Sequence, residues 1–378
     1  MGFWHLRPSA LGALYETIDV GRLHQHYRRD NGQVHGPLEL PPKGKLLRIS
    51  QWNIDHLSYA VGSYVNTEEE AAEAIAKVLI DTGADILVLN EYGVDGHRSS
   101  SQRFPFISHL TANLEAAGYR IHVASSDYPT AVATKIEEAT VYRHRLSYSR
   151  SAVGIRVQDA HGRFVRIYGT HLEVSDGRQG KARLEGMKNL LEHIKADSST
   201  SKEDEQIIPD QEPAWIIGDF NQQRERDYTT EEWSAICENK RQRHAPLDDG
   251  VCTLLEEDGY ECAFDVVRKE GIERPPRINW NRNEPPPSTH WSGTVIDYSY
   301  GKGESLRLDG VYVSPSCLSD HRMIVTDWDL FNESSEESTA PMIDTEGKSA
   351  KQRRLALGDS FGGISFLGLF PCQSTDKI

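Results

Sequence analysis

The sequence predicts a large α/β domain, and three observations carry this prediction. Strand-like and helix-like runs alternate along the middle of the chain. The 378 residues can bury a large core, although length alone fits two ordinary domains as well as one big α/β domain with additions. No run approaches the roughly 20 consecutive apolar residues of a membrane-spanning helix. We therefore expect no membrane insertion.

The first elements are two strands separated by a helix. Residues 46–54 (LLRISQWNI) and 84–93 (ADILVLNEYG) read as strands, since each is an apolar run that ends in polar residues. Residues 67–83 carry an Ala- and Glu-rich helix pattern. The acidic residues at its start suit the positive end of the helix dipole, so we assign them only that structural role.

The next elements repeat this alternation. Residues 151–174 predict a β-hairpin that turns at Asp159 to Gly162, and residues 180–196 predict an amphipathic helix. Residues 197–213 are polar, and we expect them to form a flexible, solvated loop. The strand AWIIGDFN follows this loop.

The last part of the domain begins with an unusual segment. Residues 273–293 are dense in Pro, Arg and Trp, so we expect a long irregular loop in place of a sheet strand. Strands at 306–314 and 322–330 then close the fold.

These patterns divide the chain into an N-terminal extension (1–45), one α/β domain (46–330) and a C-terminal tail (331–378) whose composition predicts disorder. The N-terminus lacks the pattern of a secretory signal, and the five scattered cysteines form no CxxC pair. We expect an intracellular protein, cytoplasmic or nuclear. The net charge of −15 argues against nucleic-acid binding through overall positive charge but leaves local basic patches open.

Polar residues suited to catalysis stand at the ends of the predicted apolar strands. Such positions lie at the rim of a sheet, where sites on α/β scaffolds usually form. In chain order the segments are QWNID with Asn53, LVLNEYG with Glu91, YGTHLEV with His171, WIIGDFNQ with Asp219 and Asn221, RLDGVYVS with Asp309, and LSDHRMI with Asp320 and His321.

In this order the six motifs resemble the endonuclease/exonuclease/phosphatase superfamily, the deoxyribonuclease-I-like proteins, over residues 46–330. The resemblance implies a four-layer α/β sandwich, in which two packed mixed sheets lie between helices and the site occupies one edge. It also implies a metal-dependent phosphoric ester hydrolase that cuts a P–O bond by in-line attack of water. The chain departs from the usual pattern at Asn90, where the family generally carries Gln; that residue supports the site, so we expect little effect.

The metal ligands follow from the resemblance and from the chemistry of phosphodiester hydrolysis, which requires a hard cation, an oriented water and a group that takes up charge on the leaving oxygen. Glu91 is the expected ligand, a hard carboxylate at a strand end. Asn53 and Asp320 complete or support the coordination in the family's arrangement. We expect Mg²⁺, with Mn²⁺ as an alternative.

The remaining motif residues receive catalytic roles. Asp219 and Asn221 lie two residues apart, so their side chains point the same way in an extended segment and can hold the attacking water and a phosphate oxygen. The resemblance places His321 opposite them, hydrogen-bonded to Asp309. The base stays open between Asp219 and His321. Family subgroups that share His171 suggest a general acid or a phosphate ligand there.

The Pro-rich segment 273–293 predicts substrate contacts. It carries aromatic and guanidinium side chains, a composition suited to stacking a base and holding phosphates. The candidates are Trp280, Trp291, Arg274, Arg277 and Arg282. His290 is a further candidate, because the family commonly places its loop beside the cleft. The alternative is a Pro-rich lid whose tryptophans pack inward.

Three hypotheses on function follow. The first is a nuclease that hydrolyses DNA or RNA, with nucleic acid as its partner. The second is a phospholipid (sphingomyelinase-like) or inositol-phosphate hydrolase, which the acidic net charge leaves open. The third is a catalytically silent scaffold, against which the complete set of motif residues counts.

Three further residues are expected to lie outside the catalytic machinery. His56 has no motif support and reads as a surface or packed histidine. Arg150 belongs to a basic stretch that could extend the basic surface of segment 273–293, but a solvated face explains this stretch equally well. Arg183, at the start of the predicted helix over 180–196, reads as a structural clamp.

Overall fold

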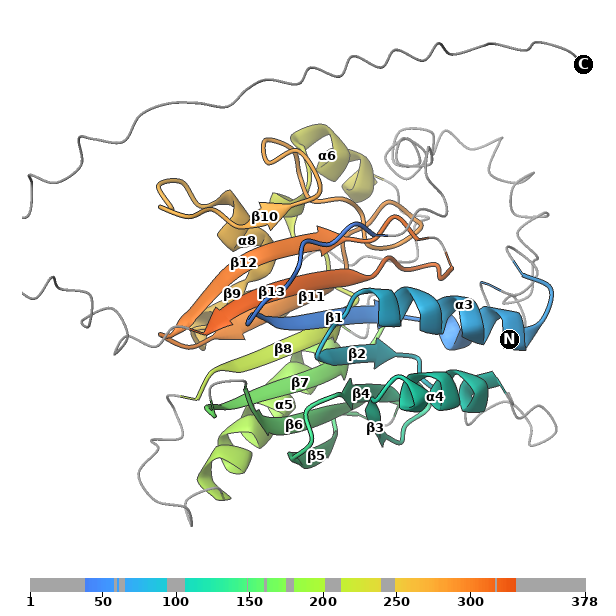
Figure 1. Ribbon diagram of the computed structural model, residues 1–378. Coiled ribbons are helices and arrows are strands. Elements are labelled where there is room, and N and C mark those ends of the chain that lie inside the picture. The colour runs from blue at the N-terminus through green and yellow to red at the C-terminus, as the bar shows by residue number, and fades with distance from the viewer. Residues whose placement is uncertain are drawn as a thin grey trace, which may run out of the picture. The chain divides into compact units, whose positions relative to one another are not determined.

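The computed structural model describes residues 38–57, 60, 65–93, 106–147, 149–159, 162–174, 180–200, 212–238, 249–316 and 318–330. Two mixed β-sheets face each other with helices outside them, the predicted four-layer arrangement (Figure 1). The predicted C-terminal tail lies outside the described residues, as does most of the N-terminal extension.

The larger sheet has seven strands in the order β10-β12-β13-β1-β2-β4-β3. The central strands β1 and β2 run parallel, whereas β1 and β13 run antiparallel. In sheet order the strands are β10 (Arg277–Ile278), β12 (Leu306–Val313), β13 (Ile324–Leu330), β1 (Leu47–Asn53), β2 (Ile86–Asn90), β4 (Thr130–Thr134) and β3 (Arg120–Ala124).

The smaller sheet has six strands in the order β5-β6-β7-β8-β11-β9. Here β7 and β8 run parallel, and β8 pairs with β11 antiparallel. In sheet order the strands are β5 (Ala139–Arg145), β6 (Ser151–Gln158), β7 (Phe164–His171), β8 (Ala214–Asp219), β11 (Asp297–Lys302) and β9 (Glu261–Cys262).

Helices α3 and α4 contact each other and share one apolar cluster with the outer face of the larger sheet, whereas residues of α5, α7 and α8 join the cluster that contains the smaller sheet (Figure 1). None of the described helices is both long enough and apolar enough to cross a membrane. The helices are α3 (Glu68–Asp81), α4 (Phe106–Ala116), α5 (Gly180–Thr200), α6 (Thr230–Glu238), α7 (Val251–Glu257) and α8 (Ala263–Arg268), with short 3₁₀ turns η2 (Asp55–Leu57) and η5 (Glu225–Asp227).

Alternation along the strands divides the core into two layers. On β2, Val88 faces the smaller sheet, while Leu87 and Leu89 join the cluster under α3 and α4. Successive strand residues point to opposite faces, so one fully buried strand supplies both layers. The two sheets meet through side chains such as Ile49, Val88 and Val132 on one side and Ile155, Ile167 and Ile217 on the other.

The start of α3 confirms a structural role for one of its leading acidic residues. Thr67 Oγ1 accepts a hydrogen bond from the backbone N–H of Glu70 at 3.2 Å, and the Glu70 carboxylate accepts one from the Thr67 N–H at 3.2 Å. This reciprocal capping box satisfies two backbone donors that the first turn leaves without partners.

Two boundaries differ from the prediction. Helix α5 continues to Thr200, so the first residues of the predicted polar loop are helical. Segment 273–293 is largely irregular as predicted, but its residues Arg277–Ile278 form β10 at the edge of the larger sheet, parallel to β12. The predicted hairpin is confirmed as β6 and β7, with Gly162 donating its backbone N–H to the Asp159 carbonyl at 3.0 Å.

Candidate active site

The strand ends bring the motif residues to one edge of both sheets. Asn53 ends β1 opposite Asn90, which ends β2 just before Glu91. In the other sheet, His171 ends β7 opposite Asp219, which ends β8. Parallel neighbours place their carboxyl ends at the same edge, so the site follows from the topology.

One glycine lets the strands approach at this edge. A Cβ on Gly218 would lie 1.8 Å from the backbone oxygen of Thr170 on β7. That same oxygen accepts a hydrogen bond from Asn90 Nδ2 at 2.9 Å. Asn90 Oδ1 accepts from the backbone N–H of Asp219 at 3.0 Å. Asn90 therefore ties the larger sheet to the smaller one beneath the site, the supporting position that the sequence predicts.

Asp219 is the centre of the site. Its Oδ2 accepts a hydrogen bond from Asn53 Nδ2 at 3.0 Å and lies 3.4 Å from His171 Nε2 and 3.7 Å from His321 Nε2. The side chain is 1% exposed, and burial raises its pKa from 3.8 to about 7, although the charge of His321 opposes the shift. A carboxyl group with a pKa near neutrality can exchange a proton at physiological pH.

His321 is oriented by Asp297. Its Nδ1 donates to Asp297 Oδ2 at 2.9 Å, and Gln51 Nε2 donates to the other Asp297 oxygen at 2.8 Å. Burial alone would lower the pKa of His321, but Asp297, Asp320 and Asp219 outweigh it and hold the pKa well above its usual value. His321 is therefore an imidazolium that presents its Nε2–H toward Asp219.

The predicted contact between Asp309 and His321 is wrong. Asp309 is the extra residue of a β-bulge in β12, where the pairing with β13 shifts between Leu308 and Gly310. Its carboxylate accepts from Arg277 and lies 3.1 Å from Arg274 Nη2. Asp309 therefore anchors the segment 273–293, and Asp297 occupies the position beside the histidine.

His171 is held as a neutral imidazole. Arg150 Nη1 lies 3.1 Å from His171 Nδ1, and because a guanidinium can only donate, Nδ1 accepts and the proton resides on Nε2. Burial and then the Arg150 charge lower the pKa of His171 well below its usual value. Two roles are predicted for His171, a phosphate ligand and a general acid. A neutral imidazole that donates one N–H suits the first role better than the second. Arg150 is buried and orients this ring, so its assignment to a solvated face is wrong.

Glu91 lies between Asn53 and His56. Its Oε1 is 3.3 Å from Asn53 Nδ2, and its Oε2 is 3.2 Å from His56 Nε2. The backbone of Glu91 adopts a left-handed φ of 57°. Asn53 Oδ1 accepts from the Asp55 backbone N–H at 3.1 Å, which orients the amide so that its Nδ2 faces Glu91 and Asp219. Asn53 thus supports Glu91 by a hydrogen bond.

Asp320 groups with two histidines. Its Oδ2 lies 3.7 Å from His290 Nε2, and its Oδ1 lies 3.9 Å from His321 Nε2. Burial alone would raise the pKa of Asp320, but His321 and His290 outweigh it and lower the pKa to about 2. The sequence prediction of His290 beside the cleft agrees with this placement.

The donor set fits a divalent cation. Asp219, Asp297 and Asp320 surround one imidazolium, and Glu91 stands beside Asn53. Within the described part of the chain, carboxylate oxygens of Asp219 and Asp297 lie within 4.8 Å of each other. Carboxylate oxygens are the ligands that Mg²⁺ and Mn²⁺ prefer, and a surplus of buried negative charge is stabilised by a cation.

The clamp role of Arg183 is confirmed. Its Nε donates to Asp249 Oδ2 at 2.6 Å, and its Nη1 donates to the backbone carbonyl of Asn221. Asn221 has a left-handed φ of 49°, and its backbone N–H donates to Asp219 Oδ1 at 2.8 Å. The clamp therefore fixes the turn that follows β8.

Most of the Pro-rich segment points away from the site. Trp280 packs its ring edge-on against Phe264 at 6.0 Å, and Arg282 donates to backbone carbonyls, including that of Val267 at 2.8 Å. The inward-packing alternative is therefore correct for Trp280, and the substrate contact predicted for Arg277 is replaced by its ion pair with Asp309. Trp291 remains beside the site, with its ring 5.6 Å from that of His290.

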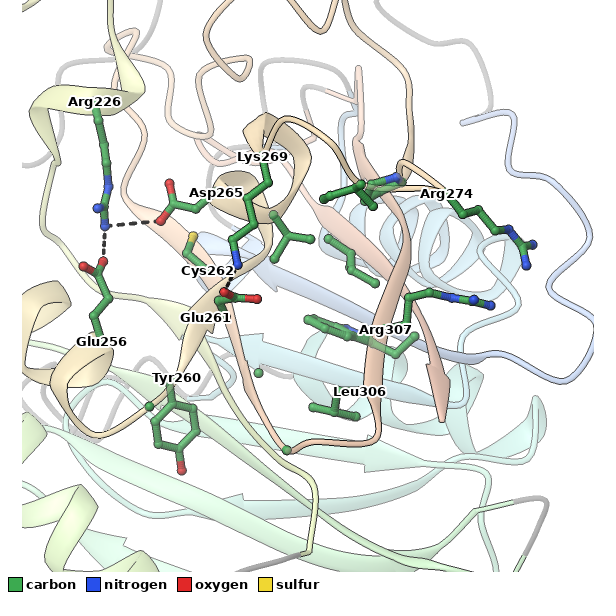
Figure 2. Close-up of a pocket in the computed structure, with 18 residues that line it drawn as sticks. Arg226, Glu256, Tyr260, Glu261, Cys262, Asp265, Lys269, Arg274, Leu306 and Arg307 are labelled. Carbon is green, nitrogen blue, oxygen red and sulfur yellow. Dashed lines mark hydrogen bonds and ion pairs between the residues drawn. The ribbon is translucent and has the colours of Figure 1, made fainter. Parts of the chain in front are cut away.

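A separate cavity of about 510 Å³ lies between α8, the last residues of β11 and the first residues of β12 (Figure 2). Asp297 opens β11, so this cavity is at the other end of that strand from the site. Its basic side chains are ion-paired, Arg226 with Glu256 and Lys269 with Glu261. It shares no lining residue with the Asp219 cluster.

The sandwich and its cluster of carboxylates and histidines define a hydrolase-like site built for a cation. The chain belongs to the endonuclease/exonuclease/phosphatase family, whose model matches residues 50–321. Members of this family are phosphoric ester hydrolases and typically depend on a divalent metal. The protein is accordingly a metal-dependent phosphoesterase.

Solved structures of low sequence identity resemble it. The human Nocturnin catalytic domain with bound sulfate is 18% identical with a TM-score of 0.49, covering 77% of this chain and 96% of that one. An endonuclease/exonuclease/phosphatase from Bacteroides vulgatus is 15% identical with a TM-score of 0.47, covering 76% and 99%. TDP2 from C. elegans is 17% identical with a TM-score of 0.44, covering 76% of each chain. No curated protein sequence matches the chain.

Proposed function

We propose that the protein is a Mg²⁺- or Mn²⁺-dependent phosphodiesterase that hydrolyses nucleic-acid backbones. The observation that carries the proposal is the convergence of Asn53, His171 and His321 on one oxygen of Asp219, within 3.0 to 3.7 Å. A buried carboxylate with a pKa near 7 and polar neighbours from both sheets is suited to take a proton from water.

Glu91 would hold the metal with the support of Asn53, and Asp320 is the further candidate ligand. A bound cation would polarise the phosphate and neutralise charge on the leaving oxygen. The Asn53 amide bridges Glu91 and Asp219 and so links the metal ligand to the base.

The protein side chains divide the remaining work. Asp219, one of the two bases that the sequence leaves open, accepts the proton of the attacking water in this proposal. His171 donates its Nε2–H to a phosphate oxygen, and the His321 imidazolium donates to the charge that develops in the transition state. Asn221 and Arg183 hold the turn that positions Asp219.

Two aromatic rings support a nucleic-acid substrate. The Tyr128 ring lies 6.1 Å from the His171 ring and carries Arg150 over its face at 4.1 Å, and Trp291 flanks His290. Both rings are partly exposed beside the cluster. Aromatic faces at this distance from a phosphate site can stack the bases on either side of the scissile bond.

The test is hydrolysis by purified protein of plasmid DNA, single-stranded DNA, structured RNA, sphingomyelin and an inositol polyphosphate, each with Mg²⁺, Mn²⁺ or EDTA. We expect metal-dependent cutting of DNA or RNA, and a loss of at least about tenfold when Tyr128→Ala and Trp291→Ala are combined. Turnover of only the lipid or the inositol phosphate would overturn the substrate class. Absence of any turnover would favour the silent scaffold.

A further inference from the structure

His56 stands directly over the metal ligand because of an unusual backbone turn. Asp55, His56 and Leu57 have φ values of 43°, 49° and 63°, so three consecutive non-glycine residues occupy the left-handed region. Such backbone is disfavoured for L-residues and persists only where surrounding contacts fix it. The turn follows Asn53 at the end of β1 and carries the His56 ring to Glu91.

The hydrogen bonds of the ring determine its donor pattern. His56 Nδ1 lies 2.6 Å from the carbonyl oxygen of Gly93, which can only accept, so Nδ1 carries the proton. The other nitrogen, Nε2, lies 3.2 Å from Glu91 Oε2. A proton on this nitrogen would be donated to the carboxylate oxygen, whereas an unprotonated Nε2 presents a lone pair to it. A cation between the two atoms would take the place of that proton and bind both.

The distance between the two atoms matches two ligands of one ion. Metal–nitrogen and metal–oxygen bonds of about 2.0–2.2 Å place neighbouring ligand atoms about 2.8–3.6 Å apart, from octahedral to tetrahedral geometry. The observed separation is 3.2 Å, and the two side chains are 12% and 17% exposed, so solvent reaches them.

We propose that His56 Nε2 is a ligand of the same metal ion as Glu91, which makes the centre a mixed nitrogen and oxygen site. This inference rests on the proposed function, in which Glu91 holds a divalent cation. Imidazole raises affinity for first-row transition ions far more than for Mg²⁺, which prefers oxygen. His56 therefore shifts the selectivity of the centre from Mg²⁺ toward ions such as Co²⁺.

The test variant is His56→Asn. Asn tolerates left-handed backbone and keeps a side-chain donor for the Gly93 carbonyl, but it has no group in the place of Nε2. His109→Asn is the matched control, since His109 Nε2 lies 3.7 Å from Glu69 Oε1 in an exposed His–Glu pair outside the site. His56→Gly, which also accepts the backbone, serves if His56→Asn fails to fold.

The measurement is calorimetric titration of the full chain with Co²⁺ and, separately, with Mg²⁺, together with the visible absorption of bound Co²⁺. We expect His56→Asn to weaken Co²⁺ binding at least about tenfold and Mg²⁺ binding less than about threefold, with a changed Co²⁺ spectrum. His109→Asn should change neither affinity, and Glu91→Gln should remove both.

Each other result identifies what has failed. Equal changes in Co²⁺ and Mg²⁺ affinity in His56→Asn, or an unchanged Co²⁺ affinity and spectrum, would overturn His56 as a ligand while leaving the metal site at Glu91 intact. If the wild type binds neither ion in a manner that Glu91→Gln removes, the proposed function fails along with this inference.

Discussion

Asp219 and Asp227 are both about 1% exposed, but their surroundings differ. Asp227 accepts hydrogen bonds from two arginines. Arg224 Nε and Nη2 each donate to its carboxylate at 2.7 Å, and Arg268 Nη2 also donates to it. Burial alone would raise the pKa of Asp227, but these two guanidinium groups outweigh burial and lower it. Asp219 instead faces Asn53, His171 and His321, and its pKa is raised.

This difference in surroundings distinguishes a carboxylate with a structural role from a carboxylate with a role in the site. A buried carboxylate that is paired with guanidinium groups stabilises the fold in its charged form. A buried carboxylate without such a partner carries a free-energy cost in its charged form, which protonation or a bound cation relieves. The Asp227 network therefore anchors η5 against α8, whereas the Asp219 cluster retains charge for a cation and a substrate.

Removing the metal ligand or the imidazolium should give the largest effect. Glu91→Ala and His321→Ala are expected to lower kcat/KM about 10³-fold or more, because Glu91 would hold the cation and the His321 imidazolium stabilises the charge that develops as substrate reacts. Steady-state hydrolysis of whichever substrate the panel identifies measures this loss, and circular dichroism checks the fold. Full activity in either folded variant would contradict the assignment.

Asp227→Asn should mainly reduce stability. It removes the buried charge that Arg224 and Arg268 share, leaves Arg224 with the more exposed Asp265 as its nearest carboxylate, and should cost about 3–5 kcal/mol in the free energy of unfolding. Because the pKa of Asp227 is lowered in the fold, its contribution is present above the unfolded value of 3.8 and is lost as pH falls below it.

Urea unfolding at neutral pH and at pH 3 measures this contribution. Asp265→Asn is the control, since Asp265 also contacts Arg224 but is 23% exposed, and it should cost about 1 kcal/mol or less. Equal losses in the two variants would show that burial of the Asp227 charge is not the cause.

Asp219→Asn should increase the free energy of unfolding at high pH, whereas Asp227→Asn decreases it. The folded pKa of about 7 lies above the unfolded value of 3.8, so metal-free wild type loses stability as pH rises between these values. Asn has no charge to bury, and the variant should be more stable at pH 8 by up to about 4 kcal/mol, with little difference at pH 4. Urea unfolding in EDTA measures this difference in stability. A variant less stable than the wild type at pH 8 would show that the buried charge of Asp219 does not destabilise the metal-free fold.

The smallest effects distinguish Asp297, the partner of His321 in the structure, from Asp309, the partner predicted from the sequence. Asp297→Asn should lower kcat/KM by about 10²-fold or more and move the basic limb of the pH profile to lower pH, because Asp297 orients the imidazolium and raises its pKa. Asp309→Asn should leave kcat/KM within about twofold and reduce stability by about 1 kcal/mol, because it only loosens Arg274 and Arg277. The reverse ranking would restore the role predicted from the sequence.

Much of the fold and the centre of the site were predictable from local patterns. Apolar runs that end in Asn53, Glu91, His171 and Asp219 predict strands whose ends meet at one edge, and the structure brings these residues together. The capping box of α3 is equally local, since Thr67 and Glu70 are three residues apart.

The predictions of the site fail where contacts between segments far apart in the sequence determine which side chains meet. Ile296-Asp297-Tyr298 and Leu308-Asp309-Gly310 both place Asp after an apolar residue, and only the register of β11 against β8 selects the first. Arg150 reaches His171 through the pairing of β6 with β7. His56 reaches Glu91 through a left-handed turn that no sequence pattern announces.

The metal ion at Glu91 can be located in a crystal of the protein soaked in Mn²⁺ and measured for anomalous scattering. We expect a Mn²⁺ peak beside Glu91, within bonding distance of one of its carboxylate oxygens. A peak only between His290, Asp320 and His321, or no peak in the cluster at all, would show that Glu91 is not the metal ligand.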